Sequence, residues 1–256
     1  MKQGMFTITA NRRLTQNVCE MILAGDTSAC QRPGQFLNIK LDGLFLRRPI
    51  SVCDYDDEEI KIIYKIVGKG TRAMAEMRSG QTLDVLTGLG NGYDSSKAGT
   101  SPVLIGGGVG IPPLYGLLKA LQRQRAAGGL ASGESAGTEK IRVILGFNTA
   151  EEIFYQNEFE AAGAEVLLAT TDGSAGVKGF VTDVLAGLDY SYFYTCGPEA
   201  MFRAIERVAK TSGQYSFEER MGCGFGACMG CSCETKYGSK RICKDGPVLE
   251  REEILW

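Results

Sequence analysis

Residues 221–247 read MGCGFGACMGCSCETKYGSKRICKDGP, and four of their cysteines follow a metal-binding pattern. Cys223, Cys228 and Cys231 are spaced C-x4-C-x2-C, and Cys243 follows a short polar loop later. This spacing is typical of the plant-type 2Fe-2S cluster, which four thiolates hold. The glycines between the cysteines allow positive φ and backbone N–H groups directed at sulfur. We therefore predict that these four cysteines hold a 2Fe-2S cluster.

A structural zinc site is the alternative for the same segment. Cys228 and Cys231 form a C-x2-C hook that alone would suit zinc. Four-cysteine zinc sites usually pair two such hooks, and the sequence has one. The spacing therefore favours the cluster. We interpret Cys233, two residues after Cys231, as a neighbour of the cluster and not a ligand.

The composition of the whole chain is that of an ordinary globular protein. Its 256 residues are 44% hydrophobic and 23% charged, with a formal net charge of −2. This charge argues against a nucleic-acid partner, and no apolar run reaches the length of a membrane span. The first residues lack the apolar core of a signal peptide. We expect a cytoplasmic protein with two domains and a small appendage.

The cysteine and histidine counts narrow the chemistry. A cytoplasmic chain keeps its thiols reduced, so nine cysteines need a reason other than disulfides. Cys19, Cys30 and Cys53 are scattered, and we interpret them as small buried hydrophobic residues. The chain has no histidine, which excludes His-dependent triads and His metal sites. Chemistry must come largely from bound cofactors.

The first 98 residues are predicted to form a small closed antiparallel barrel. Residues 60–67 read IKIIYKIV, a composition typical of a strand, and further short strands alternate with glycine-rich turns. A short helix is expected at about 71–77. Within this barrel, Arg48, Pro49, Ile50 and Ser51 lie on a strand. An arginine fork suits a flavin pyrophosphate and a serine hydroxyl suits the ring edge, although the motif alone is commonplace.

Residues 99–212 are predicted to form a doubly wound α/β domain with a parallel sheet. The remaining residues, 213–256, form the cluster-binding appendage. We interpret residues 125–140, rich in Gly, Ala and Ser, as a flexible surface insertion. The expected strands are 103–105, 141–147, 165–169 and 192–195, and the expected helices are 113–125, 151–162, 179–187 and 199–211.

Two loops of this second domain are candidates for binding a dinucleotide. The segment GGGVG, with Gly106, Gly107, Gly108 and Gly110, lies between a strand and a helix, where backbone N–H groups can hold a pyrophosphate. It departs from G-x-G-x-x-G, so a simple tight turn is the alternative. The segment Cys196-Gly197-Pro198 ends another strand at the same sheet edge. Together the loops suggest a nicotinamide dinucleotide.

Three smaller signals accompany these loops. Asp172 could accept a hydrogen bond from a ribose hydroxyl, although Asp-Gly is also an ordinary turn. Gly70-Thr71 at a helix start could hold a phosphate, but is weak evidence alone. Cys196 could lie by the nicotinamide or be a buried thiol at a strand end.

The order of these motifs resembles that of the ferredoxin reductase family. The tail, with GCGFGACMGC and CKDGP after the C-G-P helix, looks like the electron transfer subunit of type B dihydroorotate dehydrogenase. The likeness covers nearly the whole chain. It implies FAD in the barrel, NAD in the second domain and 2Fe-2S in the tail. Residues that would contact FAD by this resemblance are Arg48, Pro49, Ile50, Ser51, Ile63, Tyr64, Lys65, Gly70 and Thr71.

The resemblance also implies a partner and an electron path. A separate FMN-containing subunit would oxidise dihydroorotate in pyrimidine biosynthesis, within a heterotetramer of two copies of each subunit. Electrons would pass from FMN through the cluster and FAD to NAD+, and the barrel and the tail are expected to be separate units. Departures are modest: Thr87-Gly88 stands where the family often has Gly-Pro.

Two rival readings remain. Sulfide dehydrogenases and bifurcating ferredoxin–NADP reductases share this layout with other partners, and some of them replace one cluster cysteine by Asp. All four cysteines are present here, which favours the dihydroorotate reading. The rival from a different class is a zinc-stabilised dinucleotide-binding module without turnover.

Overall fold

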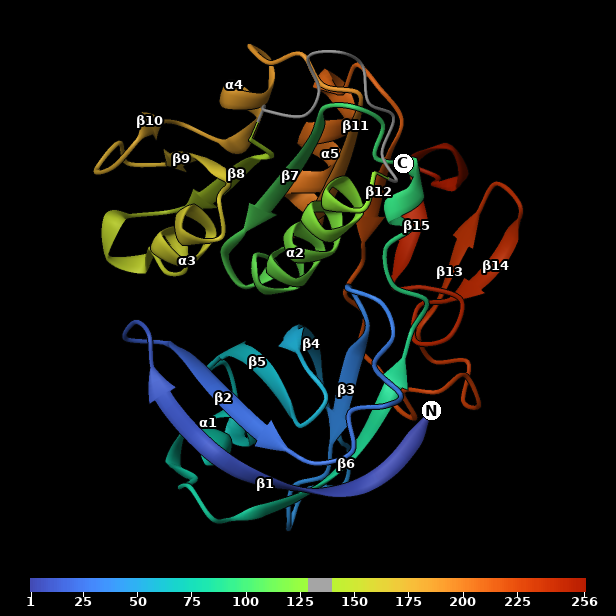
Figure 1. The fold of residues 1–256 in the computed structure, drawn as a ribbon. Helices are drawn as coiled ribbons and strands as arrows, with labels where there is room; N and C mark the ends of the chain where they lie inside the picture. The colour runs from blue at the N-terminus through green and yellow to red at the C-terminus, as the bar shows by residue number, and fades with distance from the viewer. Residues whose placement is uncertain (129–139) are drawn as a thin grey trace.

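A closed antiparallel barrel forms the first part of the chain, as predicted (Figure 1). The computed structural model describes residues 1–128 and 140–256, so most of the insertion expected at 125–140 lies outside the described residues. The strands follow the order β1-β2-β5-β4-β3-β6 around the barrel. Their bounds are β1 Lys2–Arg13, β2 Val18–Ala24, β3 Phe36–Ile39, β4 Arg48–Tyr55, β5 Glu59–Lys65 and β6 Thr82–Leu89.

Alternation along β3 separates the inside of the barrel from its outer face. Leu37 and Ile39 pack in the barrel core. Because successive side chains of a strand point to opposite faces, Phe36 and Asn38 point outward. In the antiparallel pairing with β4, Phe36 lies opposite Ser51 and Asn38 opposite Pro49. The outer face of β3 is therefore continuous with the outer face of the Arg48–Ser51 motif.

The expected short helix is present as α1 (Lys69–Glu76) and packs on the barrel. The Asn11 side chain of β1 donates hydrogen bonds to the carbonyls of Met74 and Met77, both at 2.8 Å. Met74 is fully buried in the barrel core. The last turn of α1 is thus tied to the first strand of the barrel.

The second domain is a seven-stranded sheet with helices on both faces, as predicted for a doubly wound fold. The strand order is β10-β9-β8-β7-β11-β12-β15, and every pair is parallel except β12 with β15. Leucines of α2 pack with Phe159 of α3 against one face, while Leu185 of α4 and Phe202 of α5 pack against the other. The strands are β7 Pro102–Gly107, β8 Arg142–Phe147, β9 Glu165–Thr170, β10 Val177–Lys178, β11 Tyr192–Cys196, β12 Gly213–Ser216 and β15 Val248–Glu250. The helices are α2 Pro112–Ala126, α3 Gln156–Ala161, α4 Val181–Leu185 and α5 Glu199–Val208, with 3-10 turns η1 Ser95–Lys97, η2 Gly108–Gly110, η3 Ala150–Glu152 and η4 Arg251–Glu253.

Three predicted helices were too long. The helix expected at 151–162 is reduced to η3 and α3, because Tyr155 between them has a φ of +65° and interrupts the helix. The helix expected at 179–187 covers only Val181–Leu185, since Gly179 has a φ of +133°. The helix expected at 199–211 ends at Val208, where Ala209 is already extended. In the described part of the chain, no helix is both long and apolar enough to cross a bilayer.

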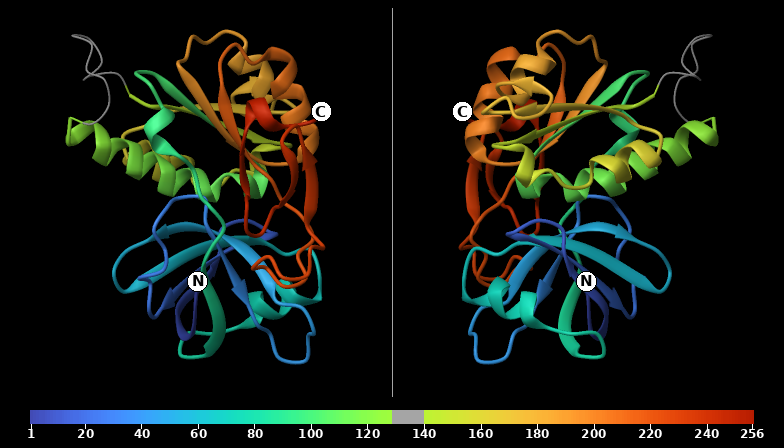
Figure 2. Two further views of the ribbon diagram at one scale, coloured as in Figure 1. Left: turned by 90° about the vertical axis from the view of Figure 1, so that its right-hand side faces the viewer. Right: turned by 90° about the vertical axis from the view of Figure 1, so that its left-hand side faces the viewer.

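The tail packs against both domains. The expectation that barrel and tail are separate units stays a prediction. Strands β12 and β15 extend the large sheet, while the residues between them form a loop that reaches the barrel and the hairpin of β13 (Ser232–Thr235) with β14 (Gly238–Arg241) (Figure 2). The hairpin lies against the C-terminal segment, where Thr235 bridges to Ile254. Asn91, after β6, donates to the Val248 carbonyl at 2.7 Å. Asn38 of the barrel donates to the Cys223 carbonyl at 3.1 Å.

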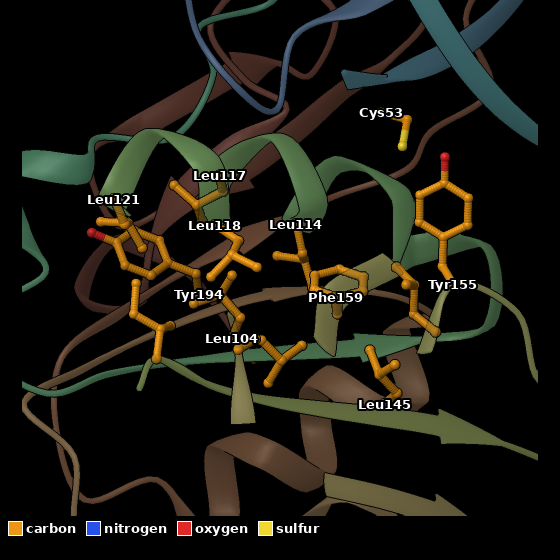
Figure 3. Close-up of a cluster of buried hydrophobic side chains, with 14 of the residues drawn as sticks. Cys53, Leu104, Leu114, Leu117, Leu118, Leu121, Leu145, Tyr155, Phe159 and Tyr194 are labelled. Carbon is orange, nitrogen blue, oxygen red and sulfur yellow. The ribbon is translucent and has the colours of Figure 1, made fainter. Parts of the chain in front are cut away.

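A hydrophobic cluster joins the barrel to the α/β domain (Figure 3). Cys53 of β4 faces Tyr155, and the leucines of α2 lie between the barrel and the sheet. At its edge, the buried Tyr155 hydroxyl donates to a Glu20 carboxylate oxygen at 2.7 Å. The other Glu20 oxygen accepts from Arg12 Nε at 2.7 Å. The two domains are therefore fixed against each other by apolar packing and a buried hydrogen bond.

Candidate cofactor sites

The four predicted cluster cysteines lie in one loop region as two neighbouring pairs. Cys223 and Cys228 interact side chain to side chain, and so do Cys231 and Cys243. Cys223 and Cys243 are also close enough to influence each other electrostatically. Two pairs are the arrangement that a binuclear cluster needs, because each iron takes two thiolates. Among residues 1–128 and 140–256, no three Cys, Asp, Glu or His side chains converge on a single metal-ion position.

Backbone donors surround the sulfur of Cys223. It accepts N–H groups of Phe225, Ala227 and Cys228 at 3.5, 3.2 and 3.5 Å. Partial burial raises the pKa of Cys223, but these donors and the Cys228 thiol outweigh it and lower the pKa to about 6. Gly224 and Gly226 both have positive φ, which turns the loop so that its N–H groups face the sulfur. The loop therefore favours a thiolate at Cys223 as the chain folds.

The second pair is more deeply buried. Cys231 and Cys243 are each 2% exposed, and the Cys243 N–H donates to the Cys231 sulfur at 3.4 Å. Burial, followed by the neighbouring Cys231, raises the pKa of Cys243 to about 12. Cys228 is exposed, so the cluster loop has one open end. Cys233 lies half-buried on β13, and its place outside the ligand set stays a prediction.

Some of the residues predicted to contact FAD lie on one face of the barrel. Pro49 and Ser51 are on the outer face of β4, opposite Asn38 and Phe36 of β3. The Arg48 guanidinium lies over Gly70, where an added Cβ would be 2.3 Å from Nε. The Thr71 hydroxyl accepts from the Val67 N–H at 2.9 Å and so shapes the start of α1. Arg48 therefore lies beside the start of α1, where Gly70 and Thr71 are, and their contact with FAD stays a prediction.

The three residues of β5 that were predicted to contact FAD do not all lie on the same face of the strand. Tyr64 points into the barrel, where it is 2% exposed and its hydroxyl donates to the Asn11 side chain at 3.1 Å. Its ring is therefore part of the barrel core, and only its backbone is available to a cofactor. Ile63 packs in the cluster between the two domains. Lys65 is exposed and lines a cavity described below.

The two predicted dinucleotide loops meet at one edge of the sheet. Gly106 pairs with Cys196 across the parallel strands β7 and β11. A Cβ at Gly110 would lie 2.3 Å from the Cys196 carbonyl oxygen, and one at Gly107 would lie 3.3 Å from Pro198. Gly197 also lies close to the glycine loop, since a Cβ added at Gly197 would lie 3.2 Å from the Gly107 nitrogen. Close approach of two backbones explains why glycine occupies these positions.

Cys196 itself is a thiol held among polar groups. Burial raises its pKa to about 12, while the hydroxyls of Ser216 and Tyr93 bond to it and partly oppose the rise. Ser216 ends β12, directly beside Cys196 in the register. Sequence reasoning missed both residues, because it placed Ser216 in the cluster-binding appendage and Tyr93 in the barrel, away from Cys196. The boundaries 1–98, 99–212 and 213–256 remain a prediction.

Asp172 lies apart from these loops. It follows β9, which is separated from β11 by β8 and β7 in the sheet order. Its carboxylate accepts from the Ser174 hydroxyl at 2.6 Å and the Ser174 N–H at 2.9 Å. These bonds lower the pKa of Asp172. The side chain thus shapes its own turn, and a ribose contact stays a prediction.

A cavity of about 160 Å³ separates the barrel from the glycine loop. Gly108 opens onto it with a φ of +52°, and an added Cβ there would contact nothing within 4 Å. Lys65 lies on the barrel side, and Glu151 and Glu152 lie on the side of the α/β domain. Sequence reasoning did not single out these two carboxylates. The remaining lining residues are Thr15, Gln16, Asn17, Val18, Val109, Phe147, Thr149 and Phe154.

Comparison with known proteins shows the family of the chain. The chain is 39% identical over 271 residues to the dihydroorotate dehydrogenase B (NAD(+)) electron transfer subunit of Geobacillus sp. (strain WCH70), covering 100% of this chain and 99% of that protein. The chain belongs to this family. The subunit of the same name from Bacillus pumilus (strain SAFR-032) is 39% identical over 268 residues, covering 99% of this chain and 98% of its own length.

Two family models match separate segments of the chain, and solved structures match most of its length. Residues 218–255 match the iron–sulfur cluster binding domain of dihydroorotate dehydrogenase B, and residues 104–207 match an oxidoreductase NAD-binding domain. The structure of NADH-dependent reduced ferredoxin–NADP oxidoreductase has a TM-score of 0.83 at 27% identity, over 99% of this chain and 90% of that one. A Neisseria gonorrhoeae ferredoxin NADP+ reductase with bound FAD and NADP shares the fold, with a TM-score of 0.67 at 17% identity, over 85% of this chain and 100% of that one.

The side chains of this electron transfer subunit fit the cofactors of its family. Two cysteine pairs with N–H donors around Cys223 suit a 2Fe-2S cluster. The Arg48 guanidinium beside the start of α1 suits the pyrophosphate of FAD. Two glycine loops at the carboxyl edge of a parallel sheet suit NAD. FAD, 2Fe-2S and NAD are therefore the cofactors that the chain is built to use.

Proposed function

We propose that this chain carries electrons from a dihydroorotate-oxidising catalytic subunit to NAD+ through its 2Fe-2S cluster and its FAD. The relatives of which it covers almost the whole length are named as electron transfer subunits of a NAD-dependent enzyme. The observation that carries the proposal is the position of the cluster loop. Its first cysteine, Cys223, is hydrogen-bonded to β3, the strand beside the proposed flavin motif.

The chemistry of the cofactors fixes their order. A flavin exchanges two electrons with a nicotinamide and one at a time with an iron–sulfur cluster, so it belongs between them. Strand β3 is the neighbour of β4, the strand that carries the proposed flavin motif, and the cluster loop is hydrogen-bonded to β3. Arg48 and Gly70 would orient FAD, and the loops at Gly106–Gly110 and Cys196–Pro198 would hold NAD. The protein's own task is to bind and orient these groups.

The finer points of the assembly belong to the same proposal. The catalytic partner carries FMN, the complex contains two copies of each subunit, and it works in the cytoplasm on pyrimidine biosynthesis. Exposed Cys228 marks the end of the cluster loop that such a partner would approach. NAD, and not NADP, is the expected acceptor, because the carboxylates of Glu151 and Glu152 beside the glycine loop would repel an added phosphate.

Dihydroorotate-driven reduction of NAD+ tests the proposal. The native complex, isolated anaerobically, is expected to contain FMN, FAD, iron and acid-labile sulfide, and to form NADH when dihydroorotate is added. A complex that is coloured and oxidises NADH with dyes, but ignores dihydroorotate, would disprove the proposed donor. Colourless protein without iron would instead support the zinc-stabilised module.

A ferredoxin–NADP reductase subunit is the second candidate, favoured by one observation. The fold matches the NADH-dependent reduced ferredoxin–NADP oxidoreductase with a TM-score of 0.83, above that of the Neisseria reductase at 0.67. The two functions differ in donor. Reduction of NAD+ by reduced ferredoxin, with none by dihydroorotate, would establish this candidate in place of the first.

A further inference from the structure

Asn38 stands between the two redox motifs of the barrel. On one side it is the cross-strand partner of Pro49 in the proposed flavin motif. On the other side its amide nitrogen donates to the Cys223 carbonyl at 3.1 Å. Directly opposite residues of an antiparallel pair have Cβ atoms about 5 Å apart. A single side chain therefore spans the distance from the strand of the flavin motif to the backbone of a cluster ligand.

The packing around Asn38 leaves its amide no freedom. The residue is 1% exposed, although it is polar and lies on the outer face of the barrel. A Cβ at Gly224 would lie 2.3 Å from the Asn38 amide nitrogen, so the cluster loop passes directly over the side chain. Its amide oxygen is buried and has no hydrogen-bond partner among the residues described here. Buried polar atoms are normally paired, so this one points to a donor supplied when the cofactors are bound.

The neighbouring residue on the same face repeats the arrangement. Phe36, two residues before Asn38, is the cross-strand partner of Ser51. It packs in the same hydrophobic cluster as Cys231 and Cys243. Each of these two β3 side chains thus lies beside a residue of the flavin motif, and Asn38 also bonds to the backbone of a cluster cysteine. Strand β3 therefore contacts both the strand of the flavin motif and the cluster loop.

The backbone of Asn38 is also held from the flavin side. Pro49, its partner on β4, has no N–H group to donate. Arg47, immediately before the flavin motif, donates to the Asn38 carbonyl at 3.3 Å and to the Asp84 carboxylate at 3.0 Å. Asp84 lies on β6, on the other side of β3. Asn38 is therefore fixed by the two neighbouring strands, β4 and β6, and by the cluster loop.

We propose that Asn38 is a positioning residue that fixes the cluster loop against the flavin strand and tunes the cluster through the Cys223 carbonyl. The proposal rests on the proposed function, since it deepens the route between cluster and FAD. Hydrogen bonds around an iron–sulfur cluster set its reduction potential. The amide N–H places the positive end of a dipole beside the loop, which stabilises the reduced, more negative cluster.

Two substitutions at Asn38 and one remote control test this role. Asn38→Leu keeps the volume but removes the donor, and Asn38→Asp keeps the shape but turns a negative oxygen toward the Cys223 carbonyl. Asn11→Leu is the matched control, because Asn11 also ties two barrel segments together through its amide, but at α1 and away from the cluster loop. All three are made in the full chain and loaded with FAD and cluster.

The readouts are the midpoint potential of the cluster, followed by EPR in a chemical redox titration, and the rate at which NADH reduces the cluster. Both Asn38 variants are expected to keep FAD and to have a lower cluster potential. NADH should reduce their cluster about tenfold more slowly, the usual effect of changing a residue that hydrogen-bonds to the ligands of a metal site. The Asn11 variant is expected to lose thermal stability with the cluster potential unchanged.

Two results would refute the role of Asn38, and a third would count against the proposed function alone. An unchanged potential and rate in both Asn38 variants would refute the role of Asn38. Equal shifts in the Asn11 variant would refute it too, because they would reflect a general loosening of the barrel. Failure of NADH to reduce the cluster in the unsubstituted chain would count against the proposed function, while the chemical titration would still decide the role of Asn38.

Discussion

At the scale of single residues, ligand chemistry could be predicted from the sequence, but the residues that hold the ligands in place could not. Cys223, Cys228, Cys231 and Cys243 stand out because thiolate spacing is a local pattern, and they lie as two pairs in the structure. Asn38 gives no such signal. It is one polar residue in the strand Phe36–Ile39, and its role depends on which distant segment covers that strand.

A cysteine substitution separates the cluster from the flavin. Cys228→Ser removes a proposed ligand, so iron and acid-labile sulfide are expected to be lost and dihydroorotate-driven electron transfer to stop. FAD should stay, because Arg48 and Gly70 lie on the barrel, and NADH–dye activity should persist. Cys233→Ser is the control and is expected to keep the cluster. The opposite pattern of iron content in the two variants would show that Cys233 is a ligand in place of Cys228.

Gly70 allows a matched test of the proposed FAD site. In Gly70→Ala the new Cβ would meet Arg48 Nε at 2.3 Å, so the guanidinium must move. FAD affinity, measured by flavin fluorescence, is expected to weaken by about 1.5–3 kcal/mol, the typical value of a hydrogen bond to a charged group. Gly68→Ala, two residues earlier, meets nothing within 4 Å and should leave FAD affinity unchanged. Equal affinities of the two variants would contradict the placing of FAD beside Arg48.

At the scale of elements, the type of each strand and helix followed from the sequence better than its ends did. The alternation of strands and helices after residue 100 predicted the parallel sheet correctly. The prediction of one helix from residue 151 was wrong, because Tyr155 adopts a left-handed backbone conformation. The neighbouring sequence gives no sign of this conformation. That conformation is stabilised by tertiary contacts, in which Tyr155 packs on Tyr115 and donates to Glu20 in the barrel.

The Tyr155–Glu20 bond predicts a pH-dependent contribution to stability. Burial raises the pKa of Glu20, but bonds from Arg12 and Tyr155 outweigh it and lower the pKa below the ordinary carboxyl value. A depressed pKa stabilises the fold above the unfolded value of about 4.3, and this stability is lost as the pH falls through the folded value. Tyr155→Phe is therefore expected to lower the free energy of unfolding by about 1–3 kcal/mol at pH 7.

Urea unfolding of the wild type and the Tyr155→Phe variant at pH 7 and pH 3.5 measures this effect. The difference between them should shrink at the lower pH, because protonation of Glu20 removes the charge to which the Tyr155 hydroxyl bonds. A difference that is the same at both pH values would mean that the hydroxyl acts without the Glu20 charge.

The approach of two glycine loops makes a prediction about NAD binding. In Gly110→Ala the Cβ would lie 2.3 Å from the Cys196 carbonyl oxygen, which would push the two loops apart. NADH–dye activity is expected to fall through a higher KM for NADH, while the iron and FAD contents stay constant. Gly187→Ala, in the same domain, meets only the Val184 carbonyl at 3.7 Å and should behave as the wild type. An unchanged KM in Gly110→Ala would remove this sheet edge as the NAD site.

At the scale of the whole molecule, the chain joins three cofactor-binding segments into one body. The barrel and the α/β architecture were predictable from local composition. The return of the tail was not, because β15 pairs with β12 only after a loop of about thirty residues that local propensity cannot place. That return brings the cluster loop onto β3, a contact that local sequence patterns do not predict.

The most direct test of the account is to mix the isolated, cofactor-loaded chain with NADH under anaerobic conditions and follow the visible absorbance of the cluster. If the cluster loop lies over β3, next to the strand of the proposed FAD motif, NADH will reduce the cluster in a first-order phase whose rate does not depend on protein concentration. Reduction that is concentration-dependent, or that appears only when a catalytic partner is added, would contradict an electron path within this single chain.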